Sequence, residues 1–182
     1  MVRAWELVNS GYRLNLAGIF NDKALEREVR SYPGWYRVNA LGYLDRKRVV
    51  EILARSKIGL VTLHPLPNYV DALPVKMFEY MAARIPVIAS SFPLWQEIVE
   101  GNGCGFCTDP RDPEAIAGTI ERIMGNASLA EEMGTNGKRA VMSRYNWAVE
   151  EVKLLHLYEI LFNRGGHRIF APHGARRPIP EL

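Results

Sequence analysis

Short apolar segments alternate with amphipathic ones along most of the chain. The segment Ile58–Leu63 is almost continuously apolar, which is typical of a parallel strand buried on both faces. Asp45 and Asp112 each precede an amphipathic segment, where an aspartate can cap the first N–H groups of a helix. We therefore predict an α/β fold: a Rossmann-like parallel sheet with helices on both faces. The expected strands are residues 13–20, 36–44, 58–63, 86–90 and 104–107, and the expected helices are residues 3–9, 23–31, 46–55, a short helix from Pro74, and residues 93–100, 113–124, 128–145 and 147–162.

The chain changes character near residue 163. Its 182 residues, 48% of them hydrophobic, are enough for one domain with a full core. Residues 1–163 carry the alternating pattern and are predicted to form this domain. Residues 164–182 have no periodicity and are rich in Gly, Pro and Arg, so we predict a flexible tail. A contact of Arg168, Arg176 and Arg177 with anionic lipids is a weaker alternative.

Charge and hydropathy argue against several classes of protein. The net charge is only +3, and Lys and Arg are scattered, so nucleic acid is not an expected partner. No apolar run approaches the roughly 18–20 residues that span a membrane, and charges near the start argue against a signal peptide. Cys104 and Cys107 form a C-x-x-C without a second Cys or His pair, so we expect apolar thiols rather than a redox or metal site. We expect a cytoplasmic protein without a metal.

The segment from Asp71 to Ser90 carries the strongest chemical signal. It reads as a loop, a short helix that starts at Pro74, and a buried strand. Lys76 and Glu79 are three residues apart and share one helix face, close to the helix N-terminus. Unpaired N–H groups and the helix dipole make such an end suitable for a phosphate. The alternative is a solvated Lys76–Glu79 ion pair beside a loop acid.

Part of this segment resembles a known family. Glu79-Tyr-Met-Ala-Ala-Arg-Ile-Pro-Val87 is similar to the second half of the acid-x7-acid signature of family 4 retaining glycosyltransferases, which have the two-domain GT-B fold. The similarity extends along residues 3–162. The resemblance implies a donor-binding domain for a nucleoside diphosphate sugar, UDP- or GDP-linked, with no other cofactor. It implies that Glu79 holds the nucleotide ribose and that Asp71 meets the donor sugar.

Further residues are assigned to the donor. His64, Tyr43 and Gly42 follow predicted strand ends, where ligands of such sheets bind. Gly42 would let a base approach the backbone, Tyr43 would flank the base and His64 would touch the sugar; a turn glycine, a surface tyrosine and a strand cap are the alternatives. Leu73 and Val75, which flank Pro74, complete the assigned set.

The sequence departs from the family pattern at several positions. Asp71 is one methylene shorter than the usual Glu. Pro74 removes a backbone N–H that could face the donor, and Lys76 would supply a charge to the diphosphate instead. Arg84 replaces the Gly expected after the helix, so we expect a left-handed residue strained by roughly 1 kcal/mol.

The resemblance also leaves parts of a complete enzyme unaccounted for. We expect the first strand with its basic loop, and the N-terminal acceptor-binding domain, to be missing. The chain alone is then expected to transfer little sugar, and the full enzyme to contact the inner membrane face peripherally. A nucleotide-sugar 2-epimerase fragment and a noncatalytic α/β binding domain are the rival readings. A dehydrogenase is disfavoured because residues 13–20 carry no G-x-G-x-x-G.

Overall fold

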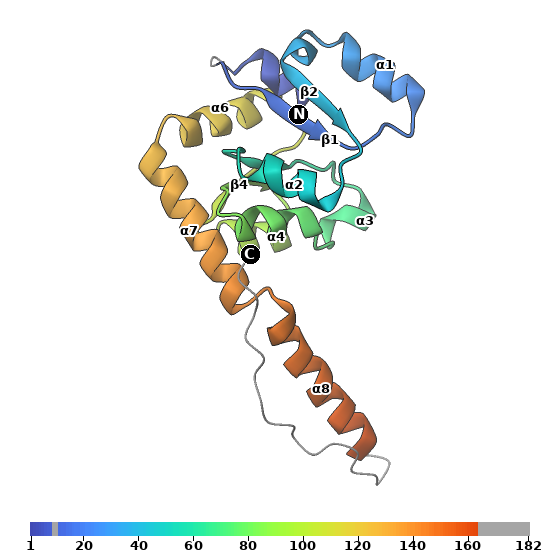
Figure 1. The fold of residues 1–182 in the computed structure, drawn as a ribbon, viewed down its shortest axis with the longest axis vertical. Coiled ribbons are helices and arrows are strands. Elements are labelled where there is room, and N and C mark those ends of the chain that lie inside the picture. The colour runs from blue at the N-terminus through green and yellow to red at the C-terminus, as the bar shows by residue number, and fades with distance from the viewer. Residues whose placement is uncertain (9–10, 164–182) are drawn as a thin grey trace. The chain divides into compact units, whose positions relative to one another are not determined.

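The computed structural model of the chain describes residues 1–8 and 11–163 (Figure 1). The chain forms two units, Met1–Ser143 and a second unit that begins at Arg144. The flexible tail expected at residues 164–182 lies outside the described residues.

The first unit is an α/β structure with parallel strands, which confirms the predicted fold class. In one sheet β1 (Leu14–Ala17) pairs with β2 (Val38–Gly42). In the other sheet the order is β3 (Gly59–Val61), β4 (Val87–Ser90) and β5 (Gly105–Thr108). The prediction of a single open sheet is therefore wrong in one respect. The strands form two separate sheets, because no strand among the described residues pairs with both β1 and β3.

Helices occupy the connections between the strands (Figure 1). In the first unit they are η1 (Val2–Glu6), α1 (Lys23–Ser31), η2 (Pro33–Arg37), α2 (Arg46–Leu53), α3 (Pro67–Val70), α4 (Val75–Ala82), α5 (Pro93–Val99), α6 (Pro113–Met124) and α7 (Ala127–Ser143). The sequence analysis missed the short elements η2 and α3. Each of them begins with a proline, whose fixed φ and missing N–H suit a first helical position.

The predicted aspartate caps are confirmed. The Asp45 carboxylate accepts a hydrogen bond from the Arg48 N–H at 2.8 Å, and Asp112 accepts from the Glu114 and Ala115 N–H groups at 2.9 and 3.0 Å. These bonds satisfy donors that the first turn of a helix leaves unpaired. They fix where α2 and α6 begin, and therefore how both helices leave the sheet edge.

The core is built around β4, whose residues are all buried. Ile88 belongs to a buried cluster with Ile116 and Ile120 of α6 and with Trp5 of η1. A strand covered on both faces is what the continuous apolar sequence of a central parallel strand predicts.

The apolar face of α4 differs from the predicted one. Helical spacing in the sequence predicts one apolar face made by Val75, Phe78, Met81 and Ala82. In the structure the fully buried residues of α4 are Met77 and Met81, and Val75 is 71% exposed. Pro74 is the residue before the helix rather than its first residue. Val75 thus lies in the open first turn, while α4 packs against α7 and β3 further along.

Helix α7 is continuous, although the two glycines Gly134 and Gly137, which are weak helix formers, predict an interrupted or weakened helix there. Both glycines are buried where α7 packs against α4. A Cβ at Gly137 would lie 3.3 Å from the Met81 Cα, and one at Gly134 would collide with the Arg84 carbonyl oxygen. The glycines therefore permit a close helix contact, and this benefit outweighs their weak helix propensity.

Arg84 has a φ of 59°, so it adopts the left-handed conformation expected from the sequence. Its guanidinium donates to the Thr135 hydroxyl at 2.9 Å, an exposed contact. We predict that Arg84→Gly leaves the free energy of unfolding unchanged or raises it by up to about 1 kcal/mol, because glycine removes the strain. Thermal melting tests this, with Ala83→Gly (φ −78°) as a control that should destabilise by about 0.5–1 kcal/mol. A melting temperature several degrees lower for Arg84→Gly would refute the prediction.

The second unit contains one described helix, α8 (Trp147–Asn163). The Asn146 side chain accepts a hydrogen bond from the Val149 N–H at 3.2 Å and caps its start. These large apolar side chains of α8 are exposed: Trp147, Val152, Leu154, Leu155, Leu157, Tyr158, Ile160, Leu161 and Phe162.

Candidate functional site

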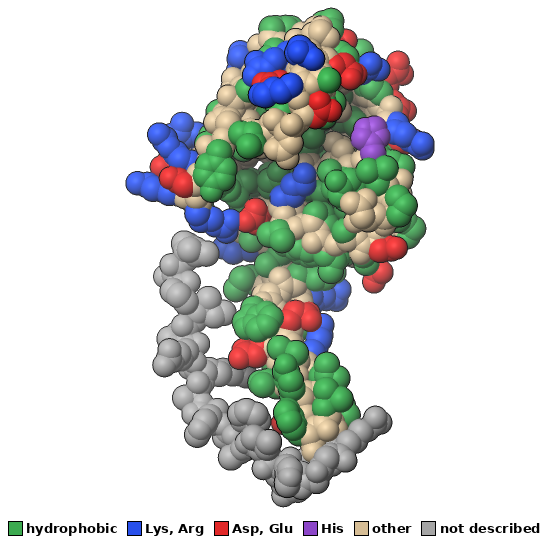
Figure 2. All heavy atoms as spheres, turned by 90° about the vertical axis from the view of Figure 1, so that its right-hand side faces the viewer, with side chains coloured by type: hydrophobic (Ala, Val, Ile, Leu, Met, Phe, Trp, Pro, Cys, Tyr) green, Lys and Arg blue, Asp and Glu red, His purple; other side chains and the backbone are tan. Residues whose placement is uncertain are grey.

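A cavity of about 500 Å³ lies in the first unit and is bordered by strands of both sheets. All four residues of β1 line it, together with Leu60 of β3 and residues of α2, α4 and α6. The space-filling view shows a hollow on this face of the unit, with charged side chains of both signs around it (Figure 2). Two of the predicted site residues, Lys76 and Glu79, line the cavity.

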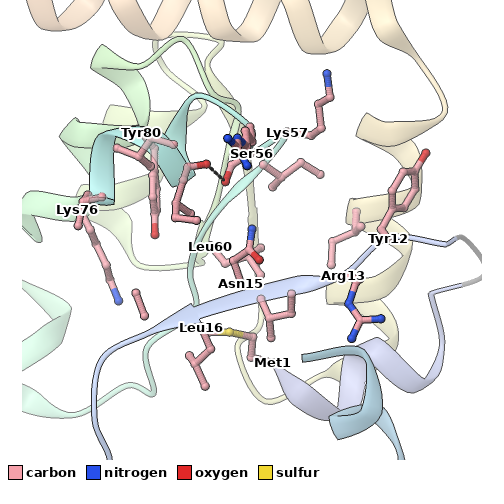
Figure 3. A pocket seen from close by; sticks show the side chains of 18 of the residues that line it. Met1, Tyr12, Arg13, Asn15, Leu16, Ser56, Lys57, Leu60, Lys76 and Tyr80 are labelled. Atoms are coloured by element: carbon pink, nitrogen blue, oxygen red, sulfur yellow. Dashed lines mark hydrogen bonds between the residues drawn. The ribbon is translucent and has the colours of Figure 1, made fainter. Parts of the chain in front are cut away.

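Lys76 and Tyr80 come from one face of α4. Both extend from the helix toward β1 (Figure 3). Burial lowers the pKa of the Lys76 ammonium, and burial together with the negative charge of Glu79 raises the pKa of Tyr80. A partly desolvated ammonium gains free energy when an anion reaches it, because part of its hydration has already been lost.

Glu79 is held by an ion pair that the sequence analysis missed. The Arg46 guanidinium of α2 donates to its carboxylate, which is 27% exposed, whereas Arg46 is 73% exposed. The alternative reading from the sequence was a surface ion pair between Lys76 and Glu79. Among the described ion pairs, Glu79 instead pairs with Arg46. The available signal was topological, because α2 follows β2 directly and its first turn lies at a strand carboxyl end.

The other predicted residues do not line this cavity. Asp71 is exposed and directly follows α3, and Leu73, Val75 and Tyr43 are exposed as well. Gly42 has a φ of 67°, a conformation that glycine adopts without strain, and an added Cβ would meet open space. The structure therefore brings Lys76 and Glu79 together and leaves Asp71 outside their cavity.

His64 is exposed in the loop after β3. Asp109 follows β5. Its pKa is lowered mainly by hydrogen bonds from the Arg111 N–H and side chain, and to a smaller extent by the electrostatic interaction with His64. The loops after these two strands of the same sheet are therefore near each other, as the carboxyl-edge argument predicts.

Residues 1–8 and 11–163 contain no cluster of three or more His, Cys, Asp or Glu side chains arranged for a metal ion. Within the same residues, no helix has the length and apolarity that crossing a membrane requires.

The two cysteines are free thiols, with Cys104 buried and Cys107 half-buried. Burial raises the pKa of Cys104 to about 11, and burial together with Glu100 raises that of Cys107 to about 12. Because only the thiolate is nucleophilic, we predict that iodoacetamide at pH 8 alkylates the native thiols about 100-fold more slowly than the thiols of the unfolded chain in guanidinium. Mass spectrometry follows the reaction, and equal native and unfolded rates would contradict the prediction.

Residues 1–140 match the family described as "Glycosyl transferases group 1". The chain belongs to this family. Its sequence is 26% identical over 131 residues to an uncharacterized glycosyltransferase of Methanocaldococcus jannaschii, covering 72% of this chain and 32% of that protein. It is also 26% identical over 95 residues to the phosphatidyl-myo-inositol mannosyltransferase of Mycobacterium leprae, covering 52% of this chain and 25% of that protein. The chain thus spans about a third or less of these curated relatives.

Solved glycosyltransferase structures share the fold. The sucrose-phosphate synthase of Thermosynechococcus elongatus superimposes with a TM-score of 0.77 at 26% identity, covering 90% of this chain and 41% of that one. The Anabaena protein HepE in complex with UDP gives a TM-score of 0.72 at 19% identity, covering 89% and 44%. These neighbours are GT-B glycosyltransferases, so the expected GT-B fold and the resemblance to group 1 glycosyltransferases are confirmed.

Proposed function

We propose that this chain is the donor-binding part of a retaining glycosyltransferase that moves a sugar from a nucleoside diphosphate sugar to a glycan or lipid-linked acceptor. The observation that carries the proposal is the pair Lys76 and Glu79, which line one cavity in a member of the group 1 family. Structures of HepE were solved with UDP and with UDP-glucose, and the Mycobacterium leprae relative is named a mannosyltransferase. These names support a nucleotide sugar as the donor class.

The roles follow from the charges. In the proposed complex Lys76 meets the diphosphate and Glu79 accepts hydrogen bonds from the ribose hydroxyls. As the bond from the anomeric carbon to the diphosphate oxygen breaks, negative charge grows on the leaving group, and the ammonium stabilises it. The acceptor hydroxyl oxygen then bonds to the anomeric carbon from the same face, which retains its configuration, and the hydroxyl proton passes to the departing diphosphate oxygen. Asp71, exposed after α3, would orient a sugar that lies outside the cavity.

The chain by itself is proposed to bind nucleotide and to transfer little sugar. It covers only 32% of the Methanocaldococcus relative, and the acceptor site would belong to the remainder of a longer enzyme. Robust transfer by residues 1–182 alone would contradict this part of the proposal.

Calorimetry with UDP and GDP tests the proposed function. We expect saturable binding of one of them, and Glu79→Ala should weaken it by about 1.5–3 kcal/mol, or roughly 10–150-fold, because a charge-assisted hydrogen bond is lost. Glu132→Ala, an exposed carboxylate on α7, is the matched control and should leave affinity unchanged. If neither nucleotide binds, the noncatalytic α/β domain is the better reading; if Glu79→Ala binds normally, the ribose assignment is wrong.

A further inference from the structure

Two cations are within reach of the Glu79 carboxylate. Lys76 is three positions earlier on α4, and helix side chains at this spacing are neighbours that pair favourably when one is Lys and the other Glu. Arg46 is on α2, 33 positions earlier in the chain, and its guanidinium donates to Glu79. Among the described ion pairs Glu79 is joined to Arg46, and none of these pairs includes Lys76. The carboxylate is therefore held by the cation that is distant in sequence.

The cavity wall shows why this choice of partner affects Lys76. Glu79 is the one carboxylate among the described residues that line the cavity. The other titratable groups of the wall are the Met1 amino group, Tyr12, Arg13, Arg55, Lys57, Lys76 and Tyr80. Burial lowers the pKa of the Lys76 ammonium, and no carboxylate of the described residues offsets this effect. Lys76 is thus a partly desolvated cation without a counter-ion, which favours the approach of an anion.

Arg46 reaches Glu79 from outside the cavity. It is the first residue of α2, and the Asp45 carboxylate fixes this turn by accepting a hydrogen bond from the Arg48 N–H at 2.8 Å. The Arg46 side chain is 73% exposed and does not belong to the described residues that line the cavity. An ion pair this exposed contributes little to folding stability. Arg46 is therefore placed to act on Glu79 rather than on a ligand in the cavity.

We propose that Arg46 is a positioning residue of the donor site: its guanidinium holds the Glu79 carboxylate away from Lys76, so that the ammonium stays available for the diphosphate and the carboxylate for the ribose. Without Arg46, Glu79 is free to pair with Lys76 on the same helix face. That pair would occupy both groups at once, because each would be the other's partner. This role of Arg46 rests on the proposed function, in which Lys76 and Glu79 meet the diphosphate and the ribose of one ligand.

An NMR titration of the ligand-free chain tests the first step. The lysine Cε signals report the charge of each ammonium, and the Lys76 signal is the one absent from Lys76→Met. In Arg46→Met we expect the Lys76 pKa to rise above that of the parent chain, because a neighbouring carboxylate favours the charged form. Arg48→Met removes a 69% exposed arginine of the same helix and should leave the Lys76 pKa unchanged. An unchanged Lys76 pKa in Arg46→Met would overturn the proposal.

Calorimetry then measures the effect on binding. With UDP or GDP, whichever the parent chain binds, Arg46→Met should weaken affinity about 5–20-fold, whereas Arg48→Met should stay within about twofold of the parent. Both variants should melt close to the parent chain, because each loses one exposed ion pair. Equal affinities of the two variants, or a melting temperature many degrees lower for Arg46→Met alone, would contradict a positioning role.

A double-variant cycle separates positioning from direct contact. In the Glu79→Gln background no carboxylate competes for Lys76, so adding Arg46→Met should leave the Lys76 pKa where Glu79→Gln puts it and should change affinity by less than about twofold. A further loss as large as that of Arg46→Met alone would mean that Arg46 contacts the ligand itself, which overturns the proposal. If the parent chain binds neither nucleotide, the proposed function fails, and the ligand-free titration still decides whether Arg46 keeps Glu79 away from Lys76.

Discussion

Trp95→Ala should lower the free energy of unfolding by about 3–5 kcal/mol, the largest effect expected for a single substitution in this chain. Trp95 has no exposed surface, and its ring centroid lies 4.7 Å from that of Phe92. Its indole N–H donates to the Ala72 carbonyl oxygen at 2.7 Å. Alanine would leave a cavity and remove this bond, against a total stability of about 5–15 kcal/mol for a typical domain. Urea unfolding followed by circular dichroism measures the loss.

Two matched substitutions separate the contributions. Trp95→Phe keeps most of the ring volume and loses the indole N–H, so it should cost about 1–3 kcal/mol. Trp147→Ala removes a 67% exposed tryptophan of α8 and should stay within about 0.5 kcal/mol of the parent chain. If Trp95→Ala and Trp147→Ala lower the free energy of unfolding by the same amount, burial of the Trp95 ring does not add to stability and the prediction is wrong. Because Ala72 adjoins Asp71, the same bond also fixes the loop before α4.

The sequence is informative where structure follows from neighbouring residues. Residues 86–90 were predicted to form a buried strand, which β4 confirms, and Asp45 and Asp112 locate helix starts through bonds to residues two or three positions away. The positive φ of Arg84 could be anticipated as well, since it follows a short helix where the family usually has glycine.

Three features of the fold depend on packing between residues far apart in the sequence and could not be predicted from local patterns. Continuity of α7 through Gly134 depends on its close approach to Arg84, 50 positions earlier in the chain. The buried face of α4 was predicted wrongly because its orientation depends on α7 and β3. The division into two sheets depends on what lies between β1 and β3, which no local pattern reports.

The candidate site shows the same limit. Lys76 and Glu79 share a face by helical spacing, so their meeting in one cavity could be predicted. The Arg46–Glu79 pair joins residues 33 positions apart on different helices, and only the tertiary structure brings them together. Asp71 was grouped with Glu79 from a motif, but it directly follows α3, which the sequence analysis missed, and it is exposed.

Lys76→Met should weaken nucleoside diphosphate binding by about 2–5 kcal/mol if the proposed function holds. Methionine keeps an apolar stem of similar length along the cavity wall and removes the ammonium, so the loss reports the charge rather than packing. Lys138→Met, on the exposed surface of α7, is the matched control and should bind like the parent chain. Calorimetry with the nucleotide that the parent chain binds best provides the comparison, and a Lys76→Met affinity equal to the control would contradict the diphosphate role.

The pH dependence of binding gives a sharper test of the same residue. Burial lowers the pKa of Lys76 in the free chain, so its ammonium loses the proton at a lower pH than an ordinary lysine does. A bound diphosphate favours the charged form and raises that pKa, so affinity should be full below the free-chain pKa and should fall as pH rises through it. In Lys76→Met this alkaline decline should disappear, because no proton is then linked to binding at this position. Calorimetry across neutral to alkaline pH distinguishes the two chains, and identical declines would mean that a group other than Lys76 carries the charge that the diphosphate meets.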